Sequence, residues 1–245
     1  MQLREMDADD LRRNMMRTFF TLRASLVGLS FALPVGLLVY SFWKNGSLQA
    51  GSISEFYGHD DGAMRDYFVG ILCSIGALLI LYKGYSQLEN WLLNFAGMFA
   101  VATALVPCNC WPGSEKSSWH GVFALLFFGC MGAVCLFCAK QTVEMLPTEE
   151  QRKWYLRAYF FIGVWLFAAP LGAYATAQIA GQRNRAVFVV EFAAIAVFAV
   201  YWALKSREIK ITSAERKALY GALENVEGKV VSRPPDVAQW QRMSV

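Results

Sequence analysis

The sequence predicts an all-α protein built as a polytopic membrane helix bundle, with six transmembrane helices and both termini in the cytoplasm. Two observations carry this prediction: apolar residues gather in long blocks, and basic residues crowd every second connection between the blocks. The chain has 56% hydrophobic and 17% charged residues, whereas a typical soluble domain has about 25% charged residues. The charges are missing from whole blocks, which indicates that these blocks lie in lipid.

Six apolar blocks approach or reach the length of about 20 residues that a helix needs to cross a bilayer core. None alternates apolar and polar residues as a barrel strand does, so we expect helices, which satisfy their own backbone groups in lipid. The predicted spans are Ala24–Trp43, Tyr67–Tyr82, Trp91–Pro107, His120–Ala139, Ala158–Gln178 and Val187–Leu204.

The distribution of the 23 Lys and Arg residues predicts the orientation. The first, third and fifth connections hold only Lys44, Arg65, Lys116, Arg183 and Arg185. All other basic residues lie in the N-terminal segment, the even connections and the C-terminal tail. Because cytoplasmic loops are rich in Lys and Arg, both termini are predicted to be cytoplasmic. No nucleic-acid partner is expected, because the basic residues alternate with the spans.

Three segments follow from this topology. Residues 1–23 form a cytoplasmic basic N-terminal segment, which we expect to extend the first helix. Residues 24–204 form the six-helix transmembrane domain, and residues 205–245 form a cytoplasmic tail with a short amphipathic helix. In the fourth connection, Pro147 followed by Thr148 and two acidic residues predicts the start of a helix that leads into the fifth span.

The helix of the tail is predicted from its start signal and its apolar face. Thr212 and Glu215 have the spacing of a capping box. The apolar residues expected on one face of this helix are Leu219, Leu223 and Val226.

The first outer connection, Lys44–Asp66, is the longest. It is rich in glycine and serine, which favour turns, and its Phe56 and Tyr57 are apolar side chains that can be buried. A loop of this length is either functional or disordered. The aromatic pair favours a loop that folds back onto the ends of the helices.

Ionisable residues gather at this same outer face. His59 lies in the first outer connection, Asp66 at the start of the second span and His120 at the start of the fourth. Glu191 lies about four residues below the outer end of the sixth span, or ~6 Å at 1.5 Å per residue. An acid within a span is costly and usually has a partner in the bundle. The expected partner is Arg183 or Arg185.

Two kinds of site fit this cluster. One is a hydrogen-bond network that binds a lipid head group or supports a partner protein, with the ligand-binding candidates Arg65, Asp66, His120, Glu191, Arg183 and Arg185. The other is a zinc site, because imidazole and carboxylate groups bind zinc and an open coordination position activates water. Its candidate ligands are His59, Asp66, His120 and Glu191. The sequence has no paired-histidine metal motif, which favours the network.

The six cysteines divide between the outer face and the spans. Cys108 and Cys110 lie at the outer face, where disulfides form, but a bridge across a single residue is strained. We predict a labile redox pair or two separate thiols. Cys135 and Cys138 share one face of an apolar helix, and we expect them to be small buried residues rather than a redox motif.

Seven stretches carry a family resemblance: Ser52-Ile53-Ser54 with Tyr57; Arg65-Asp66 with Phe68-Val69-Gly70; Tyr82 with Gly84-Tyr85; Asn94 with Ala96-Gly97; Leu105 with Pro107; His120 with Phe123-Ala124 and Phe127-Phe128; and Glu191 with Trp202 and Lys205. Over about residues 24–205 the chain resembles a family of uncharacterised bacterial multi-spanning inner-membrane proteins, defined only as a domain of unknown function. The resemblance implies a helical bundle in the bacterial cytoplasmic (inner) membrane and no agreed activity.

A more distant similarity, on Ser52, Ser54, Asp66 and His120, is to the alkaline ceramidase group of membrane hydrolases. Those seven-helix proteins bind zinc through histidines, assisted by Asp and Ser. The resemblance implies that Asp66 and Ser54 are catalytic candidates. The chain departs from the group because the paired histidines of its last helix are missing, Glu191 is the only polar group in a similar place, and six spans are predicted.

The sequence therefore predicts an integral membrane protein without defining its activity. The leading hypothesis is a non-catalytic protein with an outer-face polar pocket for a lipid head group or a partner. The alternative is a zinc-dependent hydrolase of lipid amides or esters. A small-molecule transporter is the third hypothesis, which the lack of charged residues at the midplane of the spans disfavours. The expected partners are membrane lipids, a membrane protein or a second copy of the chain.

Overall fold

The computed structural model describes residues 7–48, 50–58, 62–108, 119–180, 185–221, 223–226 and 229–232. In this part of the chain, six helical segments are long and apolar enough to cross a membrane. The predicted all-α bundle with six spanning helices is therefore confirmed. The elements of these segments are α1 (Ala8–Asn45), α2 (Ala63–Leu81), α3 (Gln87–Leu105), α4 (Trp119–Ala133), the π-helical segment η2 (Val134–Cys138), α5 (Lys140–Val143), α6 (Glu149–Ala180) and α7 (Arg185–Thr212).

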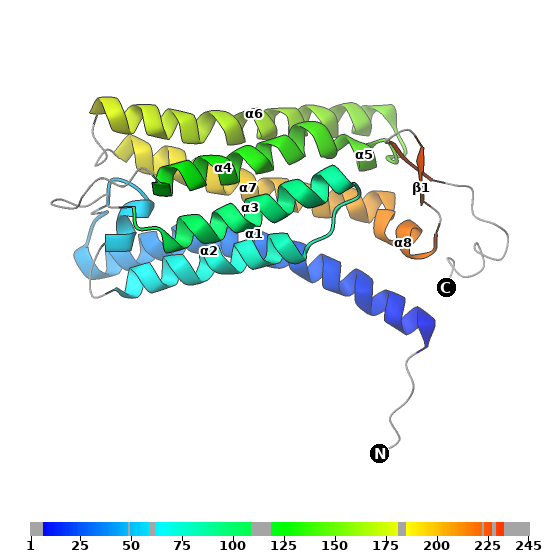
Figure 1. The fold of residues 1–245 in the computed structure, drawn as a ribbon, viewed down its shortest axis with the longest axis horizontal. Helices are drawn as coiled ribbons and strands as arrows, with labels where there is room; N and C mark the ends of the chain where they lie inside the picture. Colours follow the sequence, from blue (N-terminus) through cyan, green and yellow to red (C-terminus); the bar gives the residue numbers. More distant parts are fainter. Residues whose placement is uncertain are drawn as a thin grey trace, which may run out of the picture.

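Smaller elements mark the two ends of the bundle (Figure 1). The 3₁₀ helix η1 (Ser54–Gly58) lies where α2, α4 and α7 begin, at what we call the η1 end. The short helix α8 (Ala214–Leu219) and a hairpin of β1 (Leu223–Val226) and β2 (Lys229–Ser232) lie at the opposite end, the α8 end. From the positive-inside bias, we expect the α8 end to face the cytoplasm.

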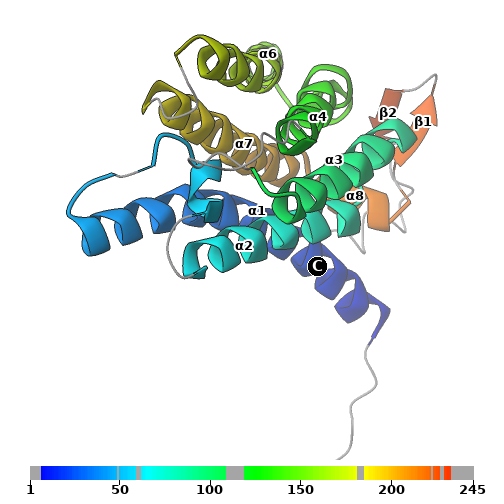
Figure 2. The ribbon, with the colours of Figure 1, turned by 60° about the vertical axis from the view of Figure 1, so that its left-hand side comes forward.

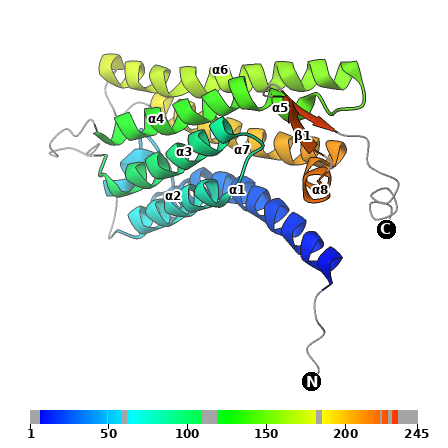
Figure 3. The same cartoon turned by 45° about the vertical axis from the view of Figure 1, so that its right-hand side comes forward.

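The first helix begins well before the first predicted span and runs without a break from Ala8 to Asn45. The predicted helical extension of that span is confirmed from Ala8 onward. Figure 3 shows that the first part of α1 leans away from the other helices. The buried Arg23 of α1 forms an ion pair with Glu215 of α8, which fastens the short helix to the long one.

Two helix starts follow from local capping. The hydroxyl oxygen of Ser86, before α3, accepts a hydrogen bond from the Glu89 N–H at 3.2 Å. Thr148, before α6, accepts from the Gln151 N–H at 3.3 Å. These side chains satisfy backbone donors that the first turn of a helix leaves without a partner. The helix start predicted after Pro147 is thus confirmed.

Glycines bring two pairs of helices close together. A Cβ atom added to Gly97 of α3 would lie 2.5 Å from the backbone oxygen of Gly76 on α2, so these helices touch through their backbones. A Cβ atom added to Gly132 of α4 would lie 2.7 Å from the ring of Phe167 on α6. Small residues of this kind allow the close packing on which helix association in membranes depends.

The C-terminal tail differs from the prediction. The expected amphipathic helix ends at Leu219, and the expected face residues Leu223 and Val226 lie in β1, which pairs antiparallel with β2. The physical reason is Gly221, whose φ of 67° lies in the left-handed region. A residue in this conformation ends a helix.

The capping box predicted for the tail is also wrong. The Thr212 hydroxyl does not cap α8, because it donates to the Glu208 carbonyl oxygen at 3.0 Å. The Glu215 carboxylate is engaged by Arg23 of α1. Both side chains are therefore used by tertiary or preceding helical contacts that the local pattern does not contain.

Aromatic side chains fill the middle of the bundle. Phe127 of α4 packs against Phe198 of α7, with ring centroids 5.5 Å apart. Phe198 contacts Trp202 at 6.4 Å, and Trp202 packs edge-on against Tyr82 at 5.0 Å. Helix α7 contacts both α1 and α6, which places it centrally in the bundle (Figure 2). This aromatic layer separates the polar groups of the η1 end from those of the α8 end.

Candidate functional site

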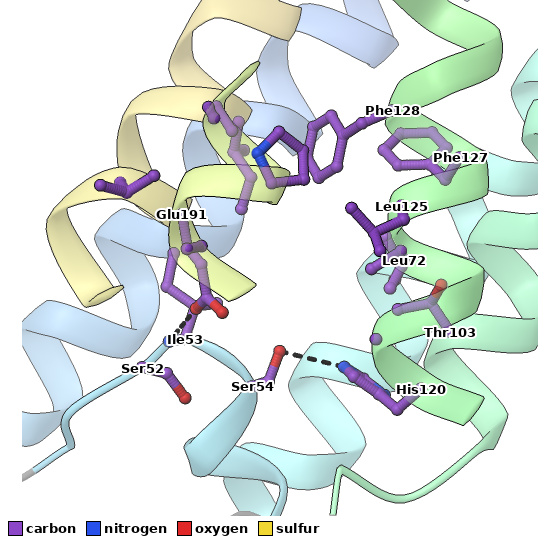
Figure 4. A pocket seen from close by; sticks show the side chains of 18 of the residues that line it. Ser52, Ile53, Ser54, Leu72, Thr103, His120, Leu125, Phe127, Phe128 and Glu191 are labelled. Atoms are coloured by element: carbon purple, nitrogen blue, oxygen red, sulfur yellow. Dashed lines mark hydrogen bonds between the residues drawn. The ribbon is translucent and has the colours of Figure 1, made fainter. Parts of the chain in front are cut away.

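A cavity of about 300 Å³ lies at the η1 end, lined by residues from the η1 loop and from all six spanning segments. Most of its wall is apolar, as Leu72 and Phe128 illustrate. Figure 4 shows Ser54, His120 and Glu191 on the side that faces the loop. We call this space the His120 cavity, and the polar residues of its loop side are Ser52, Ser54, Thr103, His120 and Glu191.

The connection before η1 brings two serines to the cavity because it folds back into the bundle. Ile53 and Phe56 are buried, each with 2% of its surface exposed. The Phe188 N–H of α7 donates to the Gly51 carbonyl oxygen at 3.1 Å and ties the loop to that helix. The predicted folding back of this connection is confirmed for the residues described, which do not include His59.

His120, in the first turn of α4, is buried, and both of its ring nitrogens have hydrogen-bond partners. Its Nδ1 lies 2.8 Å from the backbone oxygen of Val106. Because a carbonyl oxygen only accepts hydrogen bonds, Nδ1 carries the ring proton. The Nε2 atom lies 3.0 Å from Ser54 Oγ and is therefore the acceptor. In the neutral ring, Nε2 thus accepts a hydrogen bond from the Ser54 hydroxyl.

Glu191 enters the cavity from α7 and binds the backbone of the loop. Its Oε2 accepts a hydrogen bond from the Ile53 N–H at 2.6 Å, and the Ser54 N–H is a second donor to the carboxylate. Neither arginine that the sequence suggested as a partner of Glu191 is seen beside it. Arg185 is exposed at the start of α7 and does not line the cavity, and Arg183 lies outside the described residues. The loop backbone is therefore the partner that the structure shows.

Arg65 and Asp66 lie in the first turn of α2 and do not line the His120 cavity. They pair with each other, with Arg65 Nε 3.2 Å from Asp66 Oδ1, and the Asp66 side chain is 73% exposed. The acid also lies at a helix N-terminus, where the macrodipole favours negative charge. Of the predicted candidates, the cavity thus brings together Ser54, His120 and Glu191, and leaves this pair at the surface.

The zinc site is not assembled by the described residues. Among them, no group of three or more His, Cys, Asp and Glu side chains is arranged to hold a metal ion. His120 and Glu191 line the cavity, but Asp66 does not. Because His59 lies outside the described residues, the complete set of four ligands stays a prediction.

The cysteines of the two predicted groups differ in state. Cys108, after α3, lines the cavity and is disulfide-bonded, so it is not a separate thiol. Cys110 lies outside the described residues, and the lability of a redox pair stays a prediction. Cys135 and Cys138 are free and buried in η2, which confirms that they are small buried residues.

A second group of polar side chains lies at the α8 end and was not expected. The Lys205 ammonium donates to the Thr142 hydroxyl at 2.5 Å and lies 3.3 Å from Glu208 Oε2. The Tyr159 hydroxyl donates to the same carboxylate. Each of these four side chains belongs to a residue with 1% exposure or less. We call Thr142, Tyr159, Lys205 and Glu208 the Lys205 network.

Hydropathy does not reveal this network because it ends the sixth span at Leu204 and assigns Lys205 to the tail. Helix α7 instead continues to Thr212. The i, i+3 spacing of Lys205 and Glu208 is the signal that the sequence does offer. The Tyr85 ring, between α2 and α3, lies 6.0 Å from Lys205 Nζ, and burial raises the pKa of the Tyr85 hydroxyl.

The fold and the cavity define a class of protein: a polytopic helical membrane protein whose spanning segments enclose a cavity with one polar side. The family described as "Protein of unknown function (DUF998)" matches residues 26–201, which is more than half of the chain. The chain belongs to this family, so the expected resemblance to a family of unknown function is confirmed. Comparison with curated proteins and with solved structures finds no match.

Proposed function

We propose that the protein binds a membrane lipid in the His120 cavity, with the head group at the polar side and an acyl chain along the apolar wall. The observation that carries this proposal is the two-sided lining of one cavity. Ser54, His120 and Glu191 supply hydrogen-bonding groups, and Leu72 and Phe128 supply apolar surface (Figure 4). Apolar walls with a few convergent polar groups are typical of ligand pockets.

The charge pattern supports a location for this site. Basic residues are concentrated in the segments that connect at the α8 end, and cytoplasmic loops have this composition. In our proposal the His120 cavity therefore opens at the outer leaflet of a bacterial inner membrane. Membrane lipids, rather than soluble ligands, are then the molecules that surround the opening of the cavity.

The polar side of the cavity favours a head group that donates hydrogen bonds. Glu191 is the only carboxylate among the described residues that line it, and no described lysine or arginine lines it. His120 already donates through Nδ1 and accepts through Nε2. An amide or ammonium N–H complements this lining, whereas a phosphate has no basic side chain to pair with.

The transporter hypothesis gains no support from the fold. Phe127, Phe198 and Trp202 form a buried aromatic layer between the His120 cavity and the Lys205 network. A transport path needs polar groups or a water-filled cavity at this depth. A zinc-dependent hydrolase remains a second hypothesis only through His59, which the structure does not describe.

A cavity-filling variant tests the lipid-binding proposal. Gly121 lines the cavity, and a Cβ atom there would meet no heavy atom within 4 Å. In Gly121→Phe we expect the ring to fill the part of the His120 cavity that the lipid would occupy. We expect wild-type protein purified in mild detergent to retain lipid, quantified by mass spectrometry, and Gly121→Phe to lose most of it.

The matched control is Gly70→Phe. A Cβ atom on Gly70 also meets no heavy atom within 4 Å, but this residue of α2 does not line the cavity. We expect Gly70→Phe to retain as much lipid as the wild type. An absence of lipid from the wild type, or equal retention by both variants, would overturn the proposal.

A further inference from the structure

We infer that Ser54 and His120 act as a nucleophile and its general base, which cleave the acyl bond of a lipid ester or amide held in the His120 cavity. This inference rests on the proposed lipid-binding function and adds an activity to it. It does not depend on a metal ion. Its starting point is the hydrogen bond of 3.0 Å between Ser54 Oγ and His120 Nε2.

The proton arrangement of this pair is the one that a serine nucleophile requires. The Val106 carbonyl oxygen accepts from Nδ1 and so leaves the lone pair on Nε2, toward the serine. Nucleophilic serines are activated by a base whose other nitrogen is oriented by a third group. A carboxylate often fills that third place, and the backbone oxygen of Val106 fills it here.

Both residues are held by packed parts of the fold. The His120 ring lies 6.4 Å from the Phe68 ring of α2, measured between centroids, and it bonds to the end of α3 through Val106. Ser54 begins η1, which is anchored by the buried Phe56. Such fixed positions keep a reacting hydroxyl and its base in register.

Two backbone donors lie beside the nucleophile. The N–H groups of Ile53 and Ser54 are directed at the Glu191 carboxylate. A carboxylate oxygen stands in for the carbonyl oxygen of an acyl substrate, because both accept hydrogen bonds and the latter gains negative charge during attack. When Glu191 turns aside, the same donors can bind that oxygen in the transition state.

The reaction has two balanced halves. Ser54 Oγ forms a bond to the acyl carbon as its proton moves to His120 Nε2. The bond from the acyl carbon to the leaving oxygen or nitrogen then breaks, and that atom takes the proton from Nε2. In the second half, water attacks the acyl carbon of the acyl-serine and gives one proton to Nε2. The bond from that carbon to Ser54 Oγ then breaks, which releases the carboxylic acid. The proton on Nε2 returns to Ser54 Oγ.

An alkyl fluorophosphonate tests this inference, because it reacts with activated serines and carries a lipid-like chain. The full-length protein in detergent is treated with the probe, and the labelled residue is found by peptide mass spectrometry. We expect labelling at Ser54 and none at Ser52, which lines the same cavity but whose hydroxyl oxygen accepts the Glu55 N–H at 3.0 Å. Ser54→Ala should abolish labelling.

His120→Gln isolates the contribution of the base. Glutamine retains hydrogen-bonding groups but is not a general base, and loss of general-base catalysis slows reactions by ~100-fold or more. We expect Ser54 labelling to slow by this factor. The control Ser74→Ala removes an exposed hydroxyl of α2 that donates to the Gly70 carbonyl oxygen, and it should leave the rate unchanged.

A pH profile keeps the inference testable if His120→Gln does not fold. Protonation of His120 Nε2 prevents it from accepting the Ser54 proton, so the labelling rate of the wild type should fall as the imidazole protonates at lower pH. No labelling at Ser54, a rate unaffected by His120→Gln, or a rate without pH dependence would overturn the inference.

Lipid retention separates this inference from the function on which it rests. If the wild type retains lipid in a manner sensitive to Gly121→Phe but Ser54 is not labelled, the protein binds lipid without acyl chemistry. If no lipid is retained, the lipid-binding function itself fails. Labelling of Ser54 together with retained lipid supports both.

Discussion

Both ends of the bundle contain buried, hydrogen-bonded polar side chains, but the two groups differ in their surroundings. At the α8 end, Tyr159, Lys205 and Glu208 contact one another and are sealed inside the protein. At the η1 end, Ser54 and His120 are also hydrogen-bonded, but they line a cavity of about 300 Å³. The polar side chains named at both ends are hydrogen-bonded, but only those at the η1 end lie beside a cavity.

This difference teaches how a structural polar cluster is told from a site. Polar groups that satisfy each other in a packed interior constrain the fold. Polar groups that converge on a cavity with apolar walls are available to a ligand. Burial and hydrogen bonding alone do not separate the two cases, since His120 and Lys205 are both buried and both bonded.

Breaking the Lys205 network should have the largest effect. Lys205→Met leaves the buried Glu208 without its counter-charge, and removing one partner of a buried ion pair costs ~3–5 kcal/mol. We expect a large fall in the melting temperature of the detergent-purified protein, followed by circular dichroism, without selective loss of lipid.

The double variant Lys205→Met with Glu208→Met is the control for charge. Because it removes both charges of this ion pair, we expect it to recover much of the stability that the single variant loses. A double variant as unstable as the single one would show that the loss of stability does not come from an unpaired Glu208.

An intermediate effect is expected at Glu191. Glu191→Leu leaves the buried Ile53 N–H without its acceptor, which costs ~1–3 kcal/mol. We expect a moderate fall in the melting temperature, faster limited proteolysis of the η1 loop and a loss of bound lipid. Glu191→Gln keeps a carbonyl oxygen as acceptor, so it should preserve the loop. Equal proteolysis rates for the two variants would argue against this anchoring role.

The smallest effect is expected at the exposed pair of α2. Arg65→Ala breaks an ion pair in which both side chains are about half or more exposed, and such pairs contribute ~0–1 kcal/mol. We expect neither the melting temperature nor the retained lipid to change measurably. A loss of lipid from Arg65→Ala would instead indicate that the lipid-binding site extends from the cavity to the surface of α2.

Part of the candidate site could be predicted from particular residues. The positions of His120 at the start of one span and Glu191 near the start of another place both at one face of the membrane, and both line the cavity. Asp66 satisfies the same rule but lies outside the cavity, at the surface of α2. Position along a helix predicts depth in the membrane; the direction in which a side chain leaves the helix depends on the neighbouring helices.

By itself, the sequence determined that the chain crosses the membrane six times and that Ser54, His120 and Glu191 share one end of the bundle. These properties follow from hydropathy and from distance along the chain, which are local. Only the tertiary structure decided that Ser54 donates to His120, that Glu191 binds the loop backbone and that Lys205 faces the interior. Such pairings join residues far apart in the chain, and their geometry arises from the packing of whole helices against one another.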